Sequence, residues 1–353
     1  MVKLEPLTLI GAPPSPYTRK MIALLRYRHI PYNITWGDPQ GMLLGELKNL
    51  NIQPPKPALL PTFILPDEKG ILKAETDSTP LIRRFEREYE DRKCLPSDPA
   101  LNFLNYLLED FADEWVTKYM FHYRWHFEED AENAGTLLPL AQATNLPDEI
   151  HQTAKKYIAD RQIERLRVVG SNDTTAPIIE ASYKRFLSIL EDHFKNLPFL
   201  LGHRPSSADF GLYGQLSQLI GFDPTSRKIA HDLSPRTVAW ITVIEDISGL
   251  SVKDEGWSKL EELPLTIKEL LKEVGKGYVP ALLKNREAHL NEDKTWETEI
   301  DGCVWVQQTF PYQVKCLKWI NEEYSKLGDA DKKRINTIFE DTGCEKLLLN
   351  ENN

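Results

Sequence analysis

Short apolar runs and amphipathic stretches alternate at the start of the chain. Residues 7–10 (Leu-Thr-Leu-Ile) form an apolar run that ends at Gly11, which predicts a buried strand. Residues 17–29 carry apolar side chains at helical spacing beside basic ones, which predicts an amphipathic helix. Residues 32–36 (Tyr-Asn-Ile-Thr-Trp) indicate a second strand. A strand, a helix and a strand in this order predict a right-handed parallel unit.

The next segment predicts a helix, a hairpin and another helix. Residues 41–50 favour a helix, and residues 61–65 and 70–73 read as two strands joined by a short turn. Residues 81–90 form a charged amphipathic helix. Residues 1–93 thus have the order strand–helix–strand–helix–strand–strand–helix, which is that of a thioredoxin-like domain. We expect an α/β fold for this part of the chain.

Beyond a proline-containing linker the pattern becomes helical. Apolar residues recur every three or four positions along one long predicted helix, at Leu104, Leu108, Phe111, Trp115 and Tyr119. We expect an all-helical domain over residues 99–250. Residues 251–353 predict a mainly helical C-terminal extension with a helix at 312–326 and one β-like run at 303–306.

Composition narrows the classes of partner. The chain has 353 residues, of which 43 are basic and 53 acidic, so its formal charge is −10 at pH 7. This acidity argues against nucleic acid or an anionic membrane as a partner, because both require a basic footprint. No apolar stretch approaches the roughly 20 residues that a membrane-spanning helix needs.

The cysteines and the first residues favour the cytoplasm. The four cysteines show neither zinc-ligand spacing nor a CxxC pair, which indicates thiols in a reducing compartment. The first six residues include Glu5 and Pro6 where a signal peptide would have apolar residues. We therefore expect a cytoplasmic protein.

Ser15 is the most informative candidate for chemistry. It stands between the first predicted strand and helix, and Pro16 follows it, which is typical of an N-cap and a first helical position. One interpretation is that Ser15 is a helix cap and nothing more. Alternatively, the free N–H groups and the positive end of the helix dipole could hold an anion such as a thiolate, to which the hydroxyl donates. The lack of a cysteine here argues against disulfide redox chemistry.

Two further segments could hold a peptide ligand. Pro61 opens a predicted strand, and a cis bond there could leave the backbone groups of Leu60 free to pair with an extended peptide. Asp77 and Ser78 precede a helix, where Ser78 can act as an N-cap or can bind a carboxylate while Asp77 faces an ammonium group.

Together these motifs resemble the glutathione S-transferase superfamily over about residues 5–250. The resemblance implies a thioredoxin-like domain followed by a helical domain, with glutathione as co-substrate and no metal. It implies that Ser15 contacts the glutathione sulfur, with Tyr17 as the alternative. It further implies that Leu60, next to Pro61, pairs with the cysteinyl backbone and that Asp77 and Ser78 hold the γ-glutamyl end.

A second match lies in the helical part of the chain. Ser206 and Asp209 have the spacing of a capping box, which resembles the structural N-capping motif of this superfamily. The chain departs from the commonest pattern in the prolines on both sides of Ser15, in Asp77 instead of glutamate, and in its greater length. These features resemble a Ser-type, less-characterised branch with a long C-terminal extension.

The long helix supplies candidates for the second-substrate pocket. The resemblance implies that this helix lines the pocket for an electrophile, here with Tyr119, His122, Tyr123, Trp125 and His126. His122 and His126 are four residues apart, which could suit a metal, but neither an HExxH motif nor a third ligand is evident. Because these residues continue the apolar stripe, pocket lining or packing is favoured. Arg124 could pair with a substrate carboxylate or form a surface salt bridge.

The resemblance implies a glutathione transferase that conjugates the thiolate to a small electrophile, as in detoxification, and that forms a homodimer. Two alternatives stay open: a non-catalytic scaffold that binds a ligand or protein, and a glutathione-dependent reductase or isomerase. Walker, GxGxxG and GxSxG motifs are absent from the sequence, which disfavours the classes of enzyme that use them.

Overall fold

The N-terminal part of the chain forms a four-stranded sheet with helices. The computed structural model describes residues 6–348 except 38–44, 46, 142 and 253–255. The elements of this part are β1 (Leu7–Gly11), α1 (Pro16–Tyr27), β2 (Tyr32–Trp36), β3 (Thr62–Pro66), β4 (Leu72–Glu75) and α3 (Ser78–Glu88). Half of the helix expected over residues 41–50, at 41–44 and 46, lies outside the described residues, and residues 45 and 47–49 are helical. The other predicted elements of this part are confirmed.

The sheet has the strand order β2-β1-β3-β4. β1 pairs in parallel with β2, as the strand–helix–strand unit predicts, and antiparallel with β3, which pairs antiparallel with β4. This mixed sheet is thioredoxin-like. Its apolar side chains pack against α1 and α3, so that the sheet supplies one wall of the hydrophobic core.

One long helix runs through the centre of the helical region. It comprises α4 (Pro99–Phe111), a π-helical segment η1 (Ala112–Val116) and α5 (Thr117–His126). The predicted stripe from Leu104 to Tyr119 is buried along its whole length. A π-helical turn places one more residue in the helix and often occurs at functional sites.

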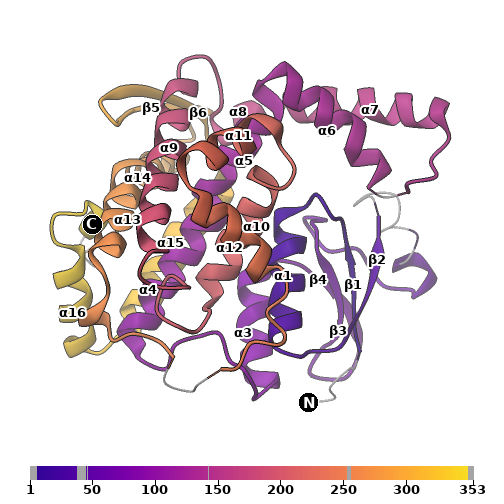
Figure 1. Ribbon diagram of the computed structural model, residues 1–353. Coiled ribbons are helices and arrows are strands. Elements are labelled where there is room, and N and C mark those ends of the chain that lie inside the picture. Colours follow the sequence, from indigo (N-terminus) through magenta and orange to yellow (C-terminus); the bar gives the residue numbers. More distant parts are fainter. Residues whose placement is uncertain (1–5, 38–44, 46, 142, 253–255, 349–353) are drawn as a thin grey trace.

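The remaining helices surround this long helix (Figure 1). They are α6 (Glu128–Leu140), α7 (Asp148–Ile163), α8 (Leu166–Val169), α9 (Ala176–His193), α10 (Ser207–Leu219), α11 (Pro224–Leu233) and α12 (Pro235–Ile244). α10 packs along α1 and so joins the helical region to the sheet domain. At Gly214 of α10, a Cβ atom would lie 2.5 Å from the carbonyl oxygen of Pro16, so only glycine permits this approach to the start of α1.

The C-terminal extension combines helices with a hairpin. Its elements are η2 (Leu260–Glu262), α13 (Leu265–Glu273), a π-helical segment η3 (Val274–Tyr278), α14 (Val279–Leu290), β5 (Thr295–Ile300), β6 (Cys303–Gln308), α15 (Pro311–Ser325), α16 (Asp329–Phe339) and η4 (Cys344–Leu347). The predicted run at 303–306 lies in β6, which pairs with β5. The predicted helix at 312–326 corresponds to α15.

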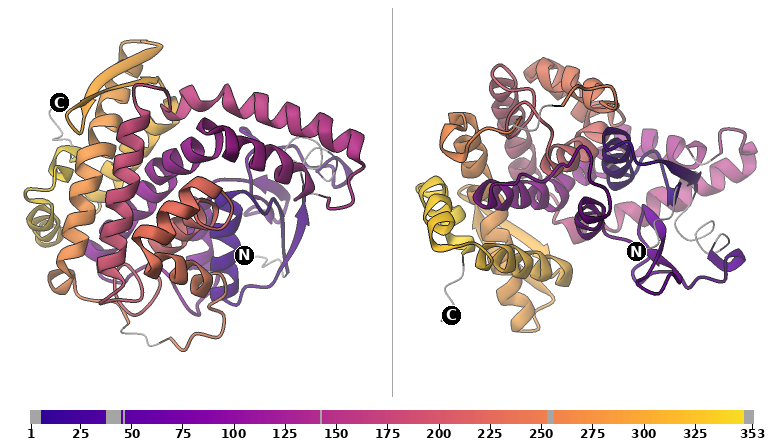
Figure 2. Two further views of the ribbon diagram at one scale, coloured as in Figure 1. Left: turned by 45° about the horizontal axis from the view of Figure 1, so that its top comes forward. Right: turned by 90° about the horizontal axis from the view of Figure 1, so that it is seen from below.

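The extension is part of the main core. Buried side chains of the sheet, of the helical region and of the extension belong to one continuous hydrophobic cluster. Both views of Figure 2 show the sheet and α16 on opposite sides of the molecule. We propose that the chain consists of three parts with boundaries at about residues 94–98 and 250. The sheet domain, the helical region and the extension then share this core.

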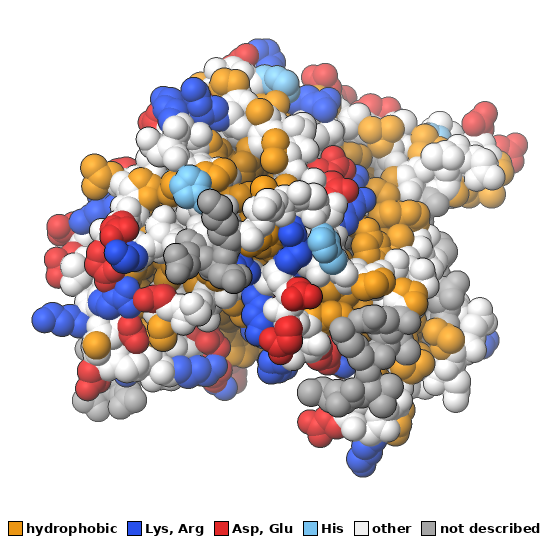
Figure 3. Space-filling view, turned by 60° about the horizontal axis from the view of Figure 1, so that its bottom comes forward, with side chains coloured by type: hydrophobic (Ala, Val, Ile, Leu, Met, Phe, Trp, Pro, Cys, Tyr) orange, Lys and Arg blue, Asp and Glu red, His pale blue; other side chains and the backbone are white. Residues whose placement is uncertain are grey.

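Charges of both signs are mixed on the surface, as the content of basic and acidic residues suggests. Basic and acidic side chains are interspersed over the face in Figure 3, and neither sign forms a broad patch there. Among the residues that the structure describes, no helix has the length and apolar character needed to cross a bilayer.

Because η3 packs closely against the C-terminal turn, adding one methyl group at this contact should destabilise the fold. A Cβ atom on Gly275 would lie 1.9 Å from the carbonyl oxygen of Thr342, so Gly275→Ala must displace backbone. We expect a loss of about 2–3 kcal/mol in the free energy of unfolding, measured by urea denaturation. Gly249→Ala is the control, because a Cβ there meets no described atom within 4 Å. Equal stability of the two variants would contradict this packing of the extension.

Candidate functional site

Three predicted segments meet at one edge of the sheet. Ile10, near the end of β1, pairs with Thr62 at the start of β3, and Phe63 pairs with Glu75 at the end of β4. Because these pairs are antiparallel, the segments after β1, before β3 and after β4 all leave the sheet at the same edge. They carry the candidates from the sequence: Ser15, Leu60, Pro61, Asp77 and Ser78.

Ser15 is the N-cap of α1. Its backbone is extended (φ −92°, ψ 119°), its Oγ accepts a hydrogen bond of 3.2 Å from the N–H of Thr18, and Pro16 is the first helical residue. The predicted cap is therefore confirmed. In the described part of the chain the Ser15 O–H has no acceptor, and the residue is partly exposed. The cap uses the oxygen as acceptor and leaves the O–H able to donate to a ligand.

A buried arginine holds the loop in front of Ser15. Arg124 of α5 donates from Nη1 to the carbonyl oxygen of Pro14 (3.1 Å) and makes a two-pronged ion pair with Asp223 (2.8 and 3.1 Å). Its guanidinium also lies over the ring of Phe222. Burial raises the pKa of Asp223 to about 6, although Arg124 opposes this shift. Both expectations for Arg124 are wrong, because its side chain is neither on the surface nor free for a substrate.

Leu60 offers backbone groups to a ligand. The Leu60–Pro61 peptide bond is cis, and Leu60 is half-buried. Among the described residues, neither the N–H nor the C=O of Leu60 has a hydrogen-bond partner. Buried backbone groups are normally paired, so this edge is suited to an extended peptide.

Asp77, rather than Ser78, caps α3. The Asp77 carboxylate accepts a hydrogen bond of 3.3 Å from the N–H of Thr79, and its backbone has a positive φ of 78°. The expectation of a Ser78 N-cap is wrong, because Ser78 is the first helical residue. Ser78 is buried, and its Oγ accepts a hydrogen bond of 3.0 Å from Nζ of Lys20.

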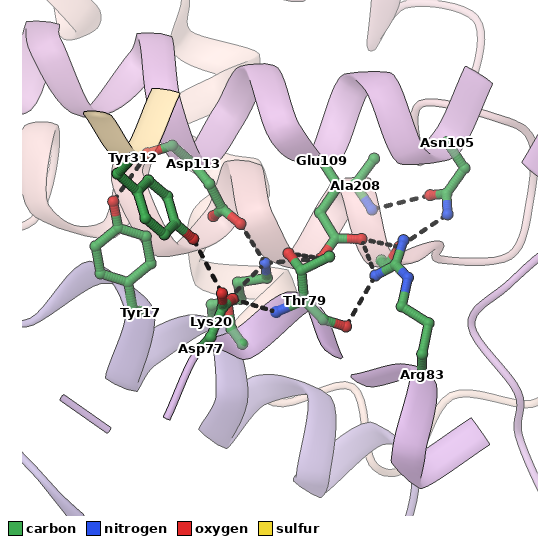
Figure 4. Close-up of polar contacts among 12 residues, drawn as sticks. Tyr17, Lys20, Asp77, Thr79, Arg83, Asn105, Glu109, Asp113, Ala208 and Tyr312 are labelled. Atoms are coloured by element: carbon green, nitrogen blue, oxygen red, sulfur yellow. Dashed lines mark hydrogen bonds and ion pairs between the residues drawn. The ribbon is translucent and has the colours of Figure 1, made fainter. Parts of the chain in front are cut away.

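Lys20 is the centre of a buried ionic network beneath this edge (Figure 4). Besides Ser78, its Nζ contacts Glu109 of α4 (2.8 Å) and Asp113 of η1 (2.5 Å). Arg83 of α3 pairs with the other oxygen of Glu109 at 2.7 Å. Burial alone would raise the pKa of Glu109, but Arg83 and Lys20 lower it to about 2. The network therefore joins α1, α3 and the long helix directly below Asp77 and Ser78.

Tyr17 lies next to this network. Its hydroxyl donates a hydrogen bond of 2.8 Å to the carbonyl oxygen of Asp113. Burial, together with the carboxyl groups of Glu114 and Asp113, raises the pKa of Tyr17 well above its usual value. Because its proton already has an acceptor, Ser15 is the better placed donor for a ligand anion.

Most of the residues expected in the second-substrate pocket are buried in the core. Tyr119, His122, Tyr123 and Trp125 are each at most 3% exposed, while His126 is half-buried. The Tyr119 hydroxyl, for example, accepts a hydrogen bond of 2.8 Å from the indole N–H of Trp115. The expectation that these four side chains line an open pocket is not met, since the apolar stripe that suggested it faces the core.

The two histidines form a stacked pair. The rings of His122 and His126 lie 4.5 Å apart, and Nδ1 of His122 is 2.8 Å from Oγ of Ser171. Burial and His126 lower the pKa of His122 to about 3. Within the described ranges, no group of three or more histidine, cysteine or acidic side chains could hold a metal ion.

The capping box at the start of α10 is present in the structure. The Asp209 carboxylate accepts hydrogen bonds of 2.8 Å from both the N–H and the hydroxyl of Ser206, and another from the N–H of Leu200. Burial raises the pKa of Asp209 to about 6, although these donors oppose the shift. The box fixes the start of the helix that packs on α1.

Comparison with known proteins identifies the first domain. Residues 9–93 match a family model described as the N-terminal domain of glutathione S-transferase. The match covers 85 of the 353 residues, so this part of the chain is similar to that N-terminal domain. In this chain the thioredoxin-like part is followed by a predominantly helical region.

Solved structures of glutathione S-transferases are similar to the chain. A glutathione S-transferase from Rhodospirillum rubrum has 15% identity and a TM-score of 0.44, covering 72% of this chain and 96% of that one. A GST-like protein from Pseudomonas syringae has 17% identity and a TM-score of 0.45, covering 68% and 67%. A glutathione transferase from Pseudomonas putida, solved with glutathione disulfide, has 14% identity and a TM-score of 0.42, covering 69% and 92%. No curated protein matches the chain.

A separate cleft of about 370 Å³ lies beside the start of α1. Pro13, Pro14 and Arg19 line it together with side chains of α10, α11 and α12. Ser15, Leu60 and Asp77 are not among its lining residues. The cleft therefore shares the loop before Ser15 but not the sheet edge described above.

Several residues of the site were not found from the sequence. Lys20, Glu109 and Asp113 are charged side chains on otherwise apolar helical faces, and this conflict was the signal that could have revealed them. Tyr312 of α15 donates a hydrogen bond of 3.0 Å to Asp77, across 235 positions of sequence. No local pattern marks such a contact.

The acidic side chains around η1 predict a pH-dependent stability. Burial and the neighbouring Asp110 and Asp113 raise the pKa of Glu114 to about 8. In the unfolded chain the pKa of a glutamate side chain is about 4.3. Between these values the folded state binds more protons than the unfolded state, so the free energy of unfolding falls as pH rises from about 4.3 to about 8.

Glu114→Gln removes this titration but keeps the size of the side chain. Between pH 5 and 8 the free energy of unfolding of the parent should fall by at least about 1 kcal/mol more than that of the variant, since one pKa unit corresponds to about 1.4 kcal/mol. Urea denaturation at a series of pH values measures this difference. Glu299→Gln, at an exposed position of β5, is the control. Parallel pH profiles of parent and Glu114→Gln would contradict the assignment.

Proposed function

We propose that the protein binds glutathione and joins the sulfur of the tripeptide to an electrophilic carbon of a small molecule. The observation that carries this proposal is the partly exposed Ser15 hydroxyl, which caps α1 at the sheet edge of a glutathione S-transferase domain and has a hydrogen to donate. The thiolate sulfur would form a bond to an electrophilic carbon. In a substitution, the bond from that carbon to the leaving group would break, and its electron pair would depart with the leaving group. In an addition to an activated double bond, the π electron pair would move to the neighbouring carbon, which would then take a proton from water.

The start of α1 can stabilise a thiolate in two ways. The N–H groups of the first helical turn and the helix dipole favour an anion at this end. The Ser15 O–H adds a charge-assisted hydrogen bond, and such a bond is worth about 1.5–3 kcal/mol. This would lower the pKa of the bound thiol by one to two units from about 8.5, which makes the nucleophile abundant at neutral pH.

The same edge offers partners for the rest of the tripeptide. The backbone groups of Leu60, which have no partner among the described residues, support pairing with the cysteinyl residue. The hydroxyl of Ser78 keeps its own hydrogen, because its oxygen accepts from Lys20, and it can donate to the γ-glutamyl carboxylate. The Asp77 carboxylate is suited to the γ-glutamyl ammonium group.

We further propose that the protein acts in the cytoplasm as a homodimer. No disulfide joins the four cysteines, all of which are described, and such thiols suit a reducing compartment. The superfamily resemblance supports the dimer. Analytical ultracentrifugation of the pure protein should give twice the chain mass of 40.6 kDa, and a single species of 40.6 kDa would exclude the dimer.

Three variants of Ser15 separate catalysis from capping. Ser15→Gly removes the hydroxyl but keeps much of the cap, whereas Ser15→Ala removes both at a cost of about 1 kcal/mol in stability. Ser15→Thr keeps both. We expect the rate of glutathione conjugation to fall about 10–100-fold in the Gly and Ala variants, since 1.4 kcal/mol corresponds to a factor of ten, and to persist in the Thr variant.

Two measurements are needed for each variant, the conjugation rate with a general electrophile and the free energy of unfolding. A Gly variant that conjugates as fast as the parent would show that Ser15 serves only as a cap. Binding of glutathione by the parent without conjugation of any electrophile would favour the non-catalytic scaffold.

A further inference from the structure

The C-terminal extension reaches the glutathione edge through one tyrosine. Tyr312 lies in the first turn of α15, and its hydroxyl donates a hydrogen bond of 3.0 Å to Oδ2 of Asp77 (Figure 4). The extension therefore contacts the carboxylate to which the proposed function assigns the γ-glutamyl ammonium group.

The tyrosine is held in a fixed place. Asn285 of α14 is fully buried and bonds both backbone groups of Phe310, accepting from its N–H (2.8 Å) and donating to its carbonyl oxygen (2.9 Å). The ring of Tyr312 packs beside Phe310 and Trp319, with ring centroids about 6 Å away. Because its segment is fixed on both sides, Tyr312 is a rigid part of the site and not a loose lid.

Asp77 lacks a cation in the described structure. Its two oxygens accept one neutral donor each, the Thr79 N–H at Oδ1 and the Tyr312 hydroxyl at Oδ2. The neighbouring cations Lys20 and Arg83 bind Glu109 and Asp113. Among the described residues, Lys20 and Arg83 thus face three carboxylates, counting Asp77, and the Asp77 carboxylate has no ion-pair partner.

A carboxylate in this state is suited to a primary ammonium group. Each carboxylate oxygen has two acceptor sites, so Oδ2 can accept from Tyr312 and from a ligand at the same time. The Tyr312 hydroxyl restricts the rotation of the carboxylate, so less freedom is lost when the ligand binds.

We propose that Tyr312 is a positioning residue that orients the Asp77 carboxylate for the ammonium group of the ligand, so that the C-terminal extension completes the glutathione site. This inference rests on the proposed function, in which the ammonium group is that of the γ-glutamyl residue.

The test compares two ligands, glutathione and an analogue in which hydrogen replaces the γ-glutamyl amino group. Isothermal titration calorimetry at pH 7 gives the Kd of each ligand for the full chain and its variants. Tyr312→Phe should weaken glutathione about 5–10-fold, the size expected for one lost hydrogen bond, and change the analogue less than twofold. In an Asp77→Asn background, Tyr312→Phe should have no further effect on glutathione.

Tyr324→Phe is the matched control. Tyr324 lies on the same helix, twelve residues after Tyr312, and donates a hydrogen bond of 2.8 Å from its hydroxyl to Oδ1 of Asn336 in α16. This variant loses one hydroxyl and one hydrogen bond but should bind both ligands like the parent. Thermal unfolding of each variant shows whether it is folded.

The outcomes separate this inference from the proposed function. Unchanged or tighter binding of glutathione by Tyr312→Phe, or an equal loss for both ligands, would overturn the role of Tyr312 and leave the proposed function intact. Absence of glutathione binding by the parent chain would overturn the proposed function and this inference with it.

Discussion

The buried ammonium group of Lys20 is the interaction on which the site depends. It binds carboxylates of the long central helix and the hydroxyl of Ser78, so one side chain links α1, α4, η1 and α3. Removing one partner of such a pair usually costs about 3–5 kcal/mol, because a charge is left buried without compensation. The network therefore fixes the start of α3, where Asp77 and Ser78 lie, relative to the helix that Ser15 caps.

The extension strengthens the same arrangement from the other side. Its π-helical segment η3 lies against η1, where a Cβ on Gly277 would be 2.6 Å from the ring of Trp115. Tyr278 of this segment also donates a hydrogen bond of 2.5 Å to Asp110. Both π-helical segments thus meet next to the acidic residues of the long helix. Residues 260–348 are accordingly a structural component of the site and not an appended tail.

Local patterns predicted much of the fold and the cap. Periodicity identified the strands of the sheet and the long helix, because each reflects a repeating burial along a few residues. Ser15 and the Ser206–Asp209 box were also predictable, since a capping residue and its partner are only three positions apart. The β-like run at 303–306 was found, but its partner β5 was not.

Contacts between distant parts of the chain were beyond such patterns. The same apolar stripe fits a residue that lines a pocket and one that packs in a core, which is why Tyr119, His122, Tyr123 and Trp125 were misplaced. Arg124 was assigned to solvent or substrate because nothing nearby in sequence indicates its buried partner Asp223. The hydrogen bond of Tyr312 with Asp77 depends on the packing of the whole extension.

The central claim is that the start of α1 stabilises the thiolate of bound glutathione. Ultraviolet titration of the thiolate absorbance, with the parent protein saturated by glutathione, measures the pKa of the bound thiol directly. The account predicts a value one to two units below that of free glutathione, and a value closer to the free one when glycine replaces Ser15. The same pKa with and without the Ser15 hydroxyl, or no shift on binding, would contradict it.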